Sequence, residues 1–300
     1  MPSEPRYATH GAVRIAYETF GDPSGAPGGE PLLLIMGLNF QMLWWPDGFC
    51  EELARRGFAV ARFDNRDAGL STHFTSPEPD RRLEALRRRK PVYRARDMVG
   101  DALAVLDALG WESAHIVGAS LGAMLAQRLA AAHPRRVRSL TSMLSMPADI
   151  HPAGALRYLR PMLTAASGRQ PERRPDEGEI RRMVKVARAI SSPGYRFDDA
   201  WARTVAERCH ARCPRDPSST MRQVRANQTD PADLSAITAP TLAISGLGDP
   251  MVRPRGGLDT ARSVAGAWFV AYHGMGHDFP EALWMPMADQ ILANARRSRP

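Results

Sequence analysis

Three side chains far apart in the sequence have the types that nucleophilic catalysis requires: Ser120, Asp249 and His277. A serine hydroxyl is a poor nucleophile near neutral pH, so it needs a neighbouring base, and the base needs a third group to orient it. Serine, acid and histidine occur here in an order known for this chemistry. The long segment before Asp249 leaves room for an inserted unit, and the shorter one before His277 fits one helix and one strand.

Ser120 stands between Gly118 and Gly122 in the stretch VGASLGAML. The apolar run AHIVGA before it is typical of a buried strand, and LGAMLAQRLAAA after it is typical of a helix. A serine on a strained turn between strand and helix needs small neighbours because the two elements approach closely. We therefore predict a nucleophile on this turn, with the N–H of Leu121 at the helix start directed toward a developing oxyanion.

The other parts of such a site follow three more apolar runs. PLLLIM (31–36) is followed by Gly37, and the N–H of Leu38 is the predicted second oxyanion donor. Asp249 comes just after the strand-like TLAISG, where open sheets gather functional groups. His277 lies in the glycine-punctuated loop HGMGHDFP after AWFVAY, which leaves its side chain free to reach the sheet edge.

Other histidines and acids nearby fit this role less well. His273 ends its predicted strand and His115 lies inside one, so both are interpreted as structural. Asp278 adjoins His277, but neighbouring side chains diverge, so Asp249 is the predicted partner of the base.

Two further groups of side chains resemble metal ligands. Asp64 and Asp67 belong to FDNRDAGLST, whose arginine and glycine favour a hydrogen-bonded structural loop. On a helix Cys209 and Cys213 share a face while His210 points away, and no fourth ligand is close in sequence. We predict neither a metal site nor a cofactor.

The order of the elements predicts an α/β fold. Continuously apolar runs at FAVARF, AHIVGA, VRSLTSML, TLAISG and AWFVAY are typical of a parallel sheet covered on both faces, and helical segments separate most of them. Residues 146–235 break this rhythm: they contain no convincing strand but two helical stretches, DEGEIRRMVKVARAI and DDAWARTVAERCHARC. The predicted organisation is a core of 1–145 and 236–300 with a helical cap at 146–235.

Composition limits the class of protein. The formal net charge is +8, but the basic residues are almost all arginine, and no aromatic residues alternate with the arginine runs at 81–89 and 173–182. We expect these runs to be solvated surface, with no nucleic-acid partner. No apolar stretch is long enough to cross a membrane or to form a signal peptide, and three cysteines suit a reducing compartment. A cytoplasmic protein is expected, and the sequence leaves its oligomeric state open.

The stretches LLLIMGLNF, WPDGF, RFDNRDAGLST, HIVGASLG, GDP and GMGH carry a family likeness. The sequence resembles the α/β-hydrolase superfamily and, within it, the aclacinomycin methylesterase group of polyketide-tailoring esterases. The resemblance implies a catalytic triad of Ser120, Asp249 and His277 with the amides of Leu38 and Leu121 as oxyanion donors. One departure is Leu38, which stands where the methylesterase pattern has a second glycine.

These observations predict a serine hydrolase that cleaves a carboxylic ester through an acyl-enzyme. A methyl ester of a bulky hydrophobic acid, such as an aromatic polyketide, is expected because large apolar residues lie on or beside the catalytic segments. The predicted substrate-binding residues are Met36, Met42, Trp44, Trp45, Met124 and Met275, in addition to Leu38. A thioesterase, a C–C bond hydrolase and a ligand receptor built on the same scaffold remain alternatives.

Overall fold

The computed structural model describes residues 2–21, 29–75, 91–160, 175–214, 216 and 218–298. The arginine runs at 81–89 and at 173–174 lie outside these residues. The strands are β1 (Arg6–His10), β2 (Val13–Phe20), β3 (Glu30–Ile35), β4 (Phe58–Phe63), β5 (Ala114–Ala119), β6 (Val137–Met143), β7 (Thr241–Gly246) and β8 (Trp268–Tyr272). The helices are α1 (Asp47–Arg55), α2 (Ala95–Ala108), α3 (Leu121–Ala132), α4 (Pro152–Ala155), α5 (Pro175–Ile190), α6 (Asp199–Arg212), α7 (Ser219–Asn227), α8 (Arg255–Ser263) and α9 (Trp284–Arg296).

The eight strands form one sheet in the order β1-β2-β4-β3-β5-β6-β7-β8. β1, β2 and β4 pair antiparallel, and every pair from β4 to β8 is parallel. β3 and β5 are neighbours with Ile35 opposite Gly118, so the turns that follow them meet at one edge. Loops after β7 and β8 reach the same edge because parallel strands share their carboxyl ends. The predicted α/β-hydrolase architecture is confirmed.

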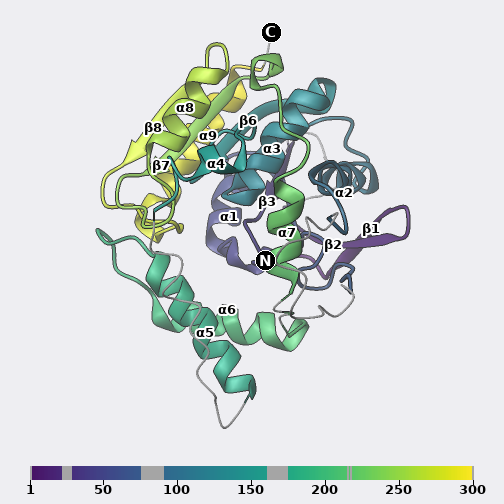
Figure 1. Ribbon diagram of the computed structural model, residues 1–300, viewed down its shortest axis with the longest axis vertical. Helices are drawn as coiled ribbons and strands as arrows, with labels where there is room; N and C mark the ends of the chain where they lie inside the picture. Colours follow the sequence, from purple (N-terminus) through teal and green to yellow (C-terminus); the bar gives the residue numbers. More distant parts are fainter. Residues whose placement is uncertain are drawn as a thin grey trace.

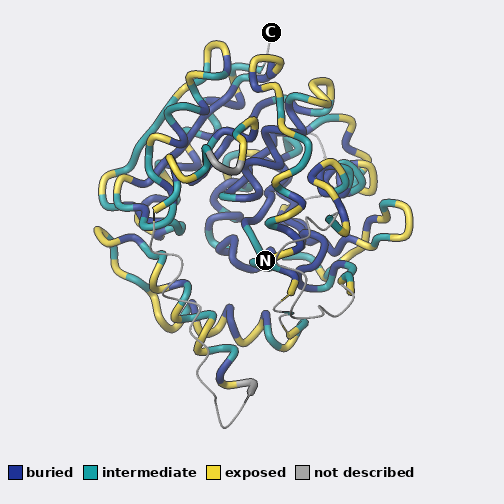
Figure 2. The backbone as a smooth tube through the Cα atoms, in the orientation of Figure 1, coloured by how far each residue is buried: buried dark blue, intermediate teal, exposed yellow. Residues whose placement is uncertain are grey.

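Helices cover both faces of the sheet (Figure 1). α1 and α9 contact each other on one face, while α2, α3 and α8 pack on the other. The strands β4, β5 and β7 are buried along their whole length, which explains their continuous apolar runs. Figure 2 shows this buried centre surrounded by exposed outer turns.

The segment between β6 and β7 supplies α4 to α7. α5 and α6 pack against each other and lie together at one side of the molecule, away from α2, α3 and α8 (Figure 1). The predicted helices at 176–190 and 198–213 agree with α5 and α6 to within one residue at each end. Across the described ranges, no helix combines the length and apolarity that a membrane crossing needs.

Candidate active site

Ser120 occupies a strained turn between β5 and α3. Its φ of 54° and ψ of −118° lie in a region that side chains other than glycine rarely adopt. A Cβ at Gly118 would lie 2.3 Å from the carbonyl oxygen of Gly122, and a Cβ at Gly122 would lie 2.1 Å from that of Ile35. The two glycines are therefore required because the strand, the turn and the helix touch backbone to backbone.

The turn after β3 lies directly against Ser120. A Cβ at Gly37 would be 3.2 Å from the Cβ of Ser120, so the next amide, that of Leu38, is close to the serine. Leu121 is the first residue of α3, and the first N–H groups of a helix have no partner within it. The turn that carries Leu38 and the start of α3 thus lie beside Ser120, and the role of the two amides as oxyanion donors stays a prediction.

α7 supports the turn that carries Leu38. The side chain of Gln223 is fully buried, and its Oε1 accepts the N–H of Asn39 at 2.8 Å. Its Nε2 donates to the carbonyl oxygen of Arg66 at 2.8 Å. The neighbouring Arg222 donates to Asp67 through two nitrogens at 2.8 Å each. The interpretation of Asp67 as a structural residue is confirmed.

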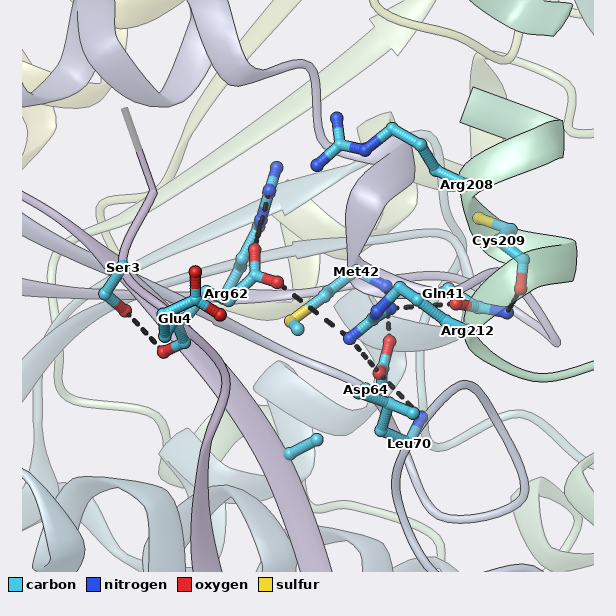
Figure 3. A network of polar contacts seen from close by, with 12 residues as sticks. Ser3, Glu4, Gln41, Met42, Arg62, Asp64, Leu70, Arg208, Cys209 and Arg212 are labelled. Carbon is cyan, nitrogen blue, oxygen red and sulfur yellow. Dashed lines mark hydrogen bonds and ion pairs between the residues drawn. The ribbon is translucent and has the colours of Figure 1, made fainter. Parts of the chain in front are cut away.

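A second polar network ties α6 to the same turn (Figure 3). The buried carboxylate of Asp64 accepts the N–H groups of Met42 and Leu70 at 2.7 and 3.0 Å and pairs with Arg212 at 3.0 Å. Gln41 accepts from Arg212 at 2.8 Å and donates to two carbonyl oxygens at the end of α6. The structural interpretation of Asp64 is likewise confirmed.

Asp249 lies against His277. The Oδ2 of Asp249 is 2.7 Å from the Nδ1 of His277, and the exposed fractions of the two side chains are 1% and 7%. The Oδ1 of Asp249 accepts the N–H groups of Met251 and Val252 at 2.7 and 2.9 Å, which fixes the carboxylate. With Nδ1 facing the carboxylate, Nε2 has no hydrogen-bond partner among the described residues. Asp278 contacts Ser192 instead of the imidazole.

Ser120 and His277 line one cavity of about 1410 Å³. Among the described residues the Ser120 hydroxyl has no hydrogen-bond partner, so its link to His277 is not formed in this state; such links often tighten only when a substrate binds. On the core side the large apolar side chains in the cavity wall include Met36, Leu38, Phe40, Trp44, Phe279 and Trp284. On the side of α5 and α6 they are Met183, Val186, Ile190, Phe197 and Trp201.

Comparison with known proteins gives a family match over most of the chain. A family model described as the alpha/beta hydrolase fold matches residues 30–280. The chain belongs to the α/β-hydrolase fold family. The resemblance found in the sequence is confirmed.

Two relatives match this α/β hydrolase along nearly its full length. Rhodomycin D methylesterase DauP of Streptomyces sp. (strain C5) and DnrP of Streptomyces peucetius are each 32% identical to it over 99% of both chains. Among solved structures, an enol-lactonase from Burkholderia xenovorans LB400 superposes with a TM-score of 0.64 at 20% identity, covering 98% of this chain and 99% of that one. This last likeness concerns the fold.

Some predicted substrate-binding residues of the hydrolase lie elsewhere. Met36, Leu38 and Trp44 line the cavity, whereas the other four do not: Met42, Trp45, Met124 and Met275. All four are buried, three of them completely. The structure places them in the packed interior, because closeness in sequence to a catalytic segment does not fix the direction of a side chain. Trp44 and Trp45 illustrate this: Trp44 faces the cavity and Trp45 stacks behind it on Phe279 at 4.5 Å.

The cavity residues on α5 were not predicted. Met183, Val186 and Ile190 repeat at intervals of three and four residues, which places them on one helix face. That spacing was visible in the sequence. The sequence did not show that this face looks toward Ser120, because the direction depends on how α5 docks on the core.

The cysteine cluster of α6 has separate contacts in the hydrolase. His210 pairs with Glu179 at 3.0 Å, and the Sγ of Cys213 is 3.5 Å from His73. Burial raises the pKa of the Cys209 thiol to about 12. Within the residues that the structure places, no group of three or more histidine, cysteine or acidic side chains is arranged to hold a metal ion.

Proposed function

We propose that this α/β hydrolase is a serine esterase that cleaves the methyl ester of a bulky hydrophobic acid, such as an aromatic polyketide. The observation that carries the proposal is the 2.7 Å contact of the buried Asp249 with His277, which lines the same cavity as Ser120 on its strained turn. A serine, an oriented base and two amides that converge on one point are the parts that acyl transfer requires.

In the proposed mechanism His277 removes the proton of Ser120 as the serine oxygen attacks the ester carbonyl. The N–H groups of Leu38 and Leu121 stabilise the oxyanion of the tetrahedral intermediate. His277 then donates its proton to the leaving methoxide, so methanol departs and the acyl group stays on Ser120. Water, activated by His277, releases the acid. Asp249 accepts the Nδ1–H throughout, which keeps Nε2 available to the serine.

The substrate side of the proposal rests on the cavity and on the two relatives. A volume of about 1410 Å³ bordered by aromatic and methionine side chains exceeds what a short acetate fills. The relatives are named as methylesterases of rhodomycin D. We further propose that residues 146–235 act as a cap, with α5 and α6 enclosing the acid part of the substrate. Remote binding energy from that part then accelerates the chemical step.

The decisive variant is Ser120→Ala. We expect it to lose methylesterase activity and labelling by a fluorophosphonate while its circular dichroism stays unchanged, because only the nucleophile is removed. The wild-type protein should prefer methyl esters of polycyclic aromatic acids over p-nitrophenyl acetate and over thioesters in kcat/KM. Near-normal turnover by the variant would contradict the serine mechanism. A preference for thioesters would indicate a thioesterase instead. Labelling of the wild type without turnover would indicate a receptor.

A further inference from the structure

The residues between α5 and α6 (191–198, the α5–α6 connector) and the last residue of α5 lie against the loop that carries the proposed base. The N–H of His277 donates to the carbonyl oxygen of Ile190 at 2.8 Å. The N–H of Gly276 donates to the Oγ of Ser192 at 2.7 Å. Two consecutive N–H groups of the loop that carries the base therefore donate to the segment between β6 and β7.

The two segments approach so closely that side chains do not fit between them. A Cβ at Gly276 would lie 2.5 Å from the carbonyl carbon of Ser191. A Cβ at Gly194 would lie 2.6 Å from the Cα of Gly274, and the N–H of Gly194 donates to the carbonyl oxygen of Gly274 at 2.9 Å. Such backbone contact leaves little freedom for the loop to move independently of the α5–α6 connector.

The hydroxyl of Ser192 lies at the centre of this contact. Ser192 is 4% exposed, and its Oγ accepts from Gly276 while it donates to the Oδ1 of Asp278. These partners stand on either side of His277 in the sequence. One buried hydroxyl therefore fixes the backbone before the base and the side chain after it. The mechanism proposed above assigns no role to Ser192 or Asp278.

We infer that Ser192 is a positioning residue for His277, holding the imidazole in the direction that lets Nε2 reach Ser120. The inference rests on the proposed function, since it concerns the base of that reaction. Without the hydroxyl, the Gly276 N–H and the Asp278 carboxylate both lose a buried partner, and the loop relaxes around His277. Small displacements of a catalytic group reduce the rate much more than they reduce substrate binding.

The test compares Ser192→Ala with Ser191→Ala, its neighbour, whose exposed hydroxyl caps the end of α5 by donating to the carbonyl oxygen of Arg188. Hydrolysis of p-nitrophenyl acetate is measured per active site, with sites counted by fluorophosphonate labelling taken to completion. For Ser192→Ala we expect kcat to fall about tenfold or more with KM changed less than about twofold, because a misplacement near 1 Å costs ~100-fold. Ser191→Ala should retain wild-type kcat, and Ser192→Thr, which keeps the hydroxyl, should recover most of the loss.

Wild-type kcat per titrated site in Ser192→Ala, even with a lower melting temperature, would overturn the inference and leave Ser192 a packing residue. An equal loss of kcat in Ser191→Ala would overturn it too. If Ser192→Ala is insoluble, Asp278→Ala removes the other end of the same link, and the same criteria apply to it. Activity in Ser120→Ala would instead refute the proposed function, so the two failures are separable.

Discussion

At the scale of single residues, the site could be predicted wherever geometry restricts the residue type. A turn with a φ of 54° at Ser120 costs about 1–3 kcal/mol and tolerates only small neighbours, so the two glycines beside the serine were a readable signal. Asp249 was readable from its place after a strand. The role inferred for Ser192 could not be predicted from the sequence, because its partners Gly276 and Asp278 are distant in sequence and no local pattern marks the contact.

Asp278 gives a pH-dependent prediction. Burial raises the pKa of its carboxyl group above the usual range, and hydrogen bonds from Ser192 offset this only in part. The folded state then binds this proton more tightly than the unfolded state, so the residue makes the protein lose stability as pH rises from the unfolded value through the folded one. Asp278→Asn has no titratable group at this position, so it does not lose stability in this way. We expect its melting temperature to gain a few degrees on that of the wild type between about pH 4 and pH 7.

Thermal unfolding followed by circular dichroism across this pH range measures the difference. Asn retains an oxygen that can accept from Ser192, so kcat should change little. The expectation is contradicted if the difference in melting temperature between variant and wild type stays constant with pH, or if the variant becomes less stable than the wild type as pH rises. Either result would show that ionisation of Asp278 does not destabilise the folded protein.

At the scale of elements, apolar periodicity identified the buried strands and the helices α5 and α6, yet α7 was missed. Its buried positions are Ser219, Arg222, Gln223 and Ala226, which are mostly polar. The three polar ones hydrogen-bond to the turns that support the site, as the pair of Arg222 with Asp67 shows. A helix held by polar contacts has no apolar stripe for sequence reasoning to detect.

The contact of Arg212 in α6 with Gln41 and Asp64 leads to a prediction on stability. Arg212→Gln removes the ion pair with the buried Asp64, and we expect a loss of about 1.5–3 kcal/mol in the free energy of unfolding, the usual worth of a charge-assisted hydrogen bond. Arg208, one turn earlier on α6, is the matched control: its side chain is 45% exposed and 3.5 Å from Asp47. Arg208→Gln should change stability by less than about 0.5 kcal/mol. Urea unfolding of both variants measures these changes. Equal losses of stability in the two variants would contradict a stabilising role of the ion pair between Arg212 and Asp64.

At the scale of the whole molecule, the parallel sheet and the meeting of its strand ends followed from the order of elements in the sequence. The placement of α5 and α6 did not follow. Their docking depends on specific contacts with the core. The side chain of Gln41 donates to a carbonyl oxygen near the end of α6, and the backbone of Gly276 lies against the α5–α6 connector. Which face of α5 borders the cavity, and hence which residues would select a substrate, is known only from the structure.

That face gives the last prediction. Val186 lines the cavity, whereas Val184 on the same helix is not in its wall. Val186→Trp fills space that a polycyclic acid would need but a short acyl group would not. We expect it to lower kcat/KM for a bulky aromatic methyl ester by about tenfold, equal to ~1.4 kcal/mol, while p-nitrophenyl acetate is hydrolysed within about twofold of the wild-type rate. Val184→Trp should alter neither rate, because the added ring points away from the cavity. Parallel losses on both substrates in Val186→Trp would mean that α5 disturbs the catalytic loops rather than the binding of the acid. Unchanged hydrolysis of the bulky ester would place its acid part elsewhere, and α5 would then have no part in choosing the substrate.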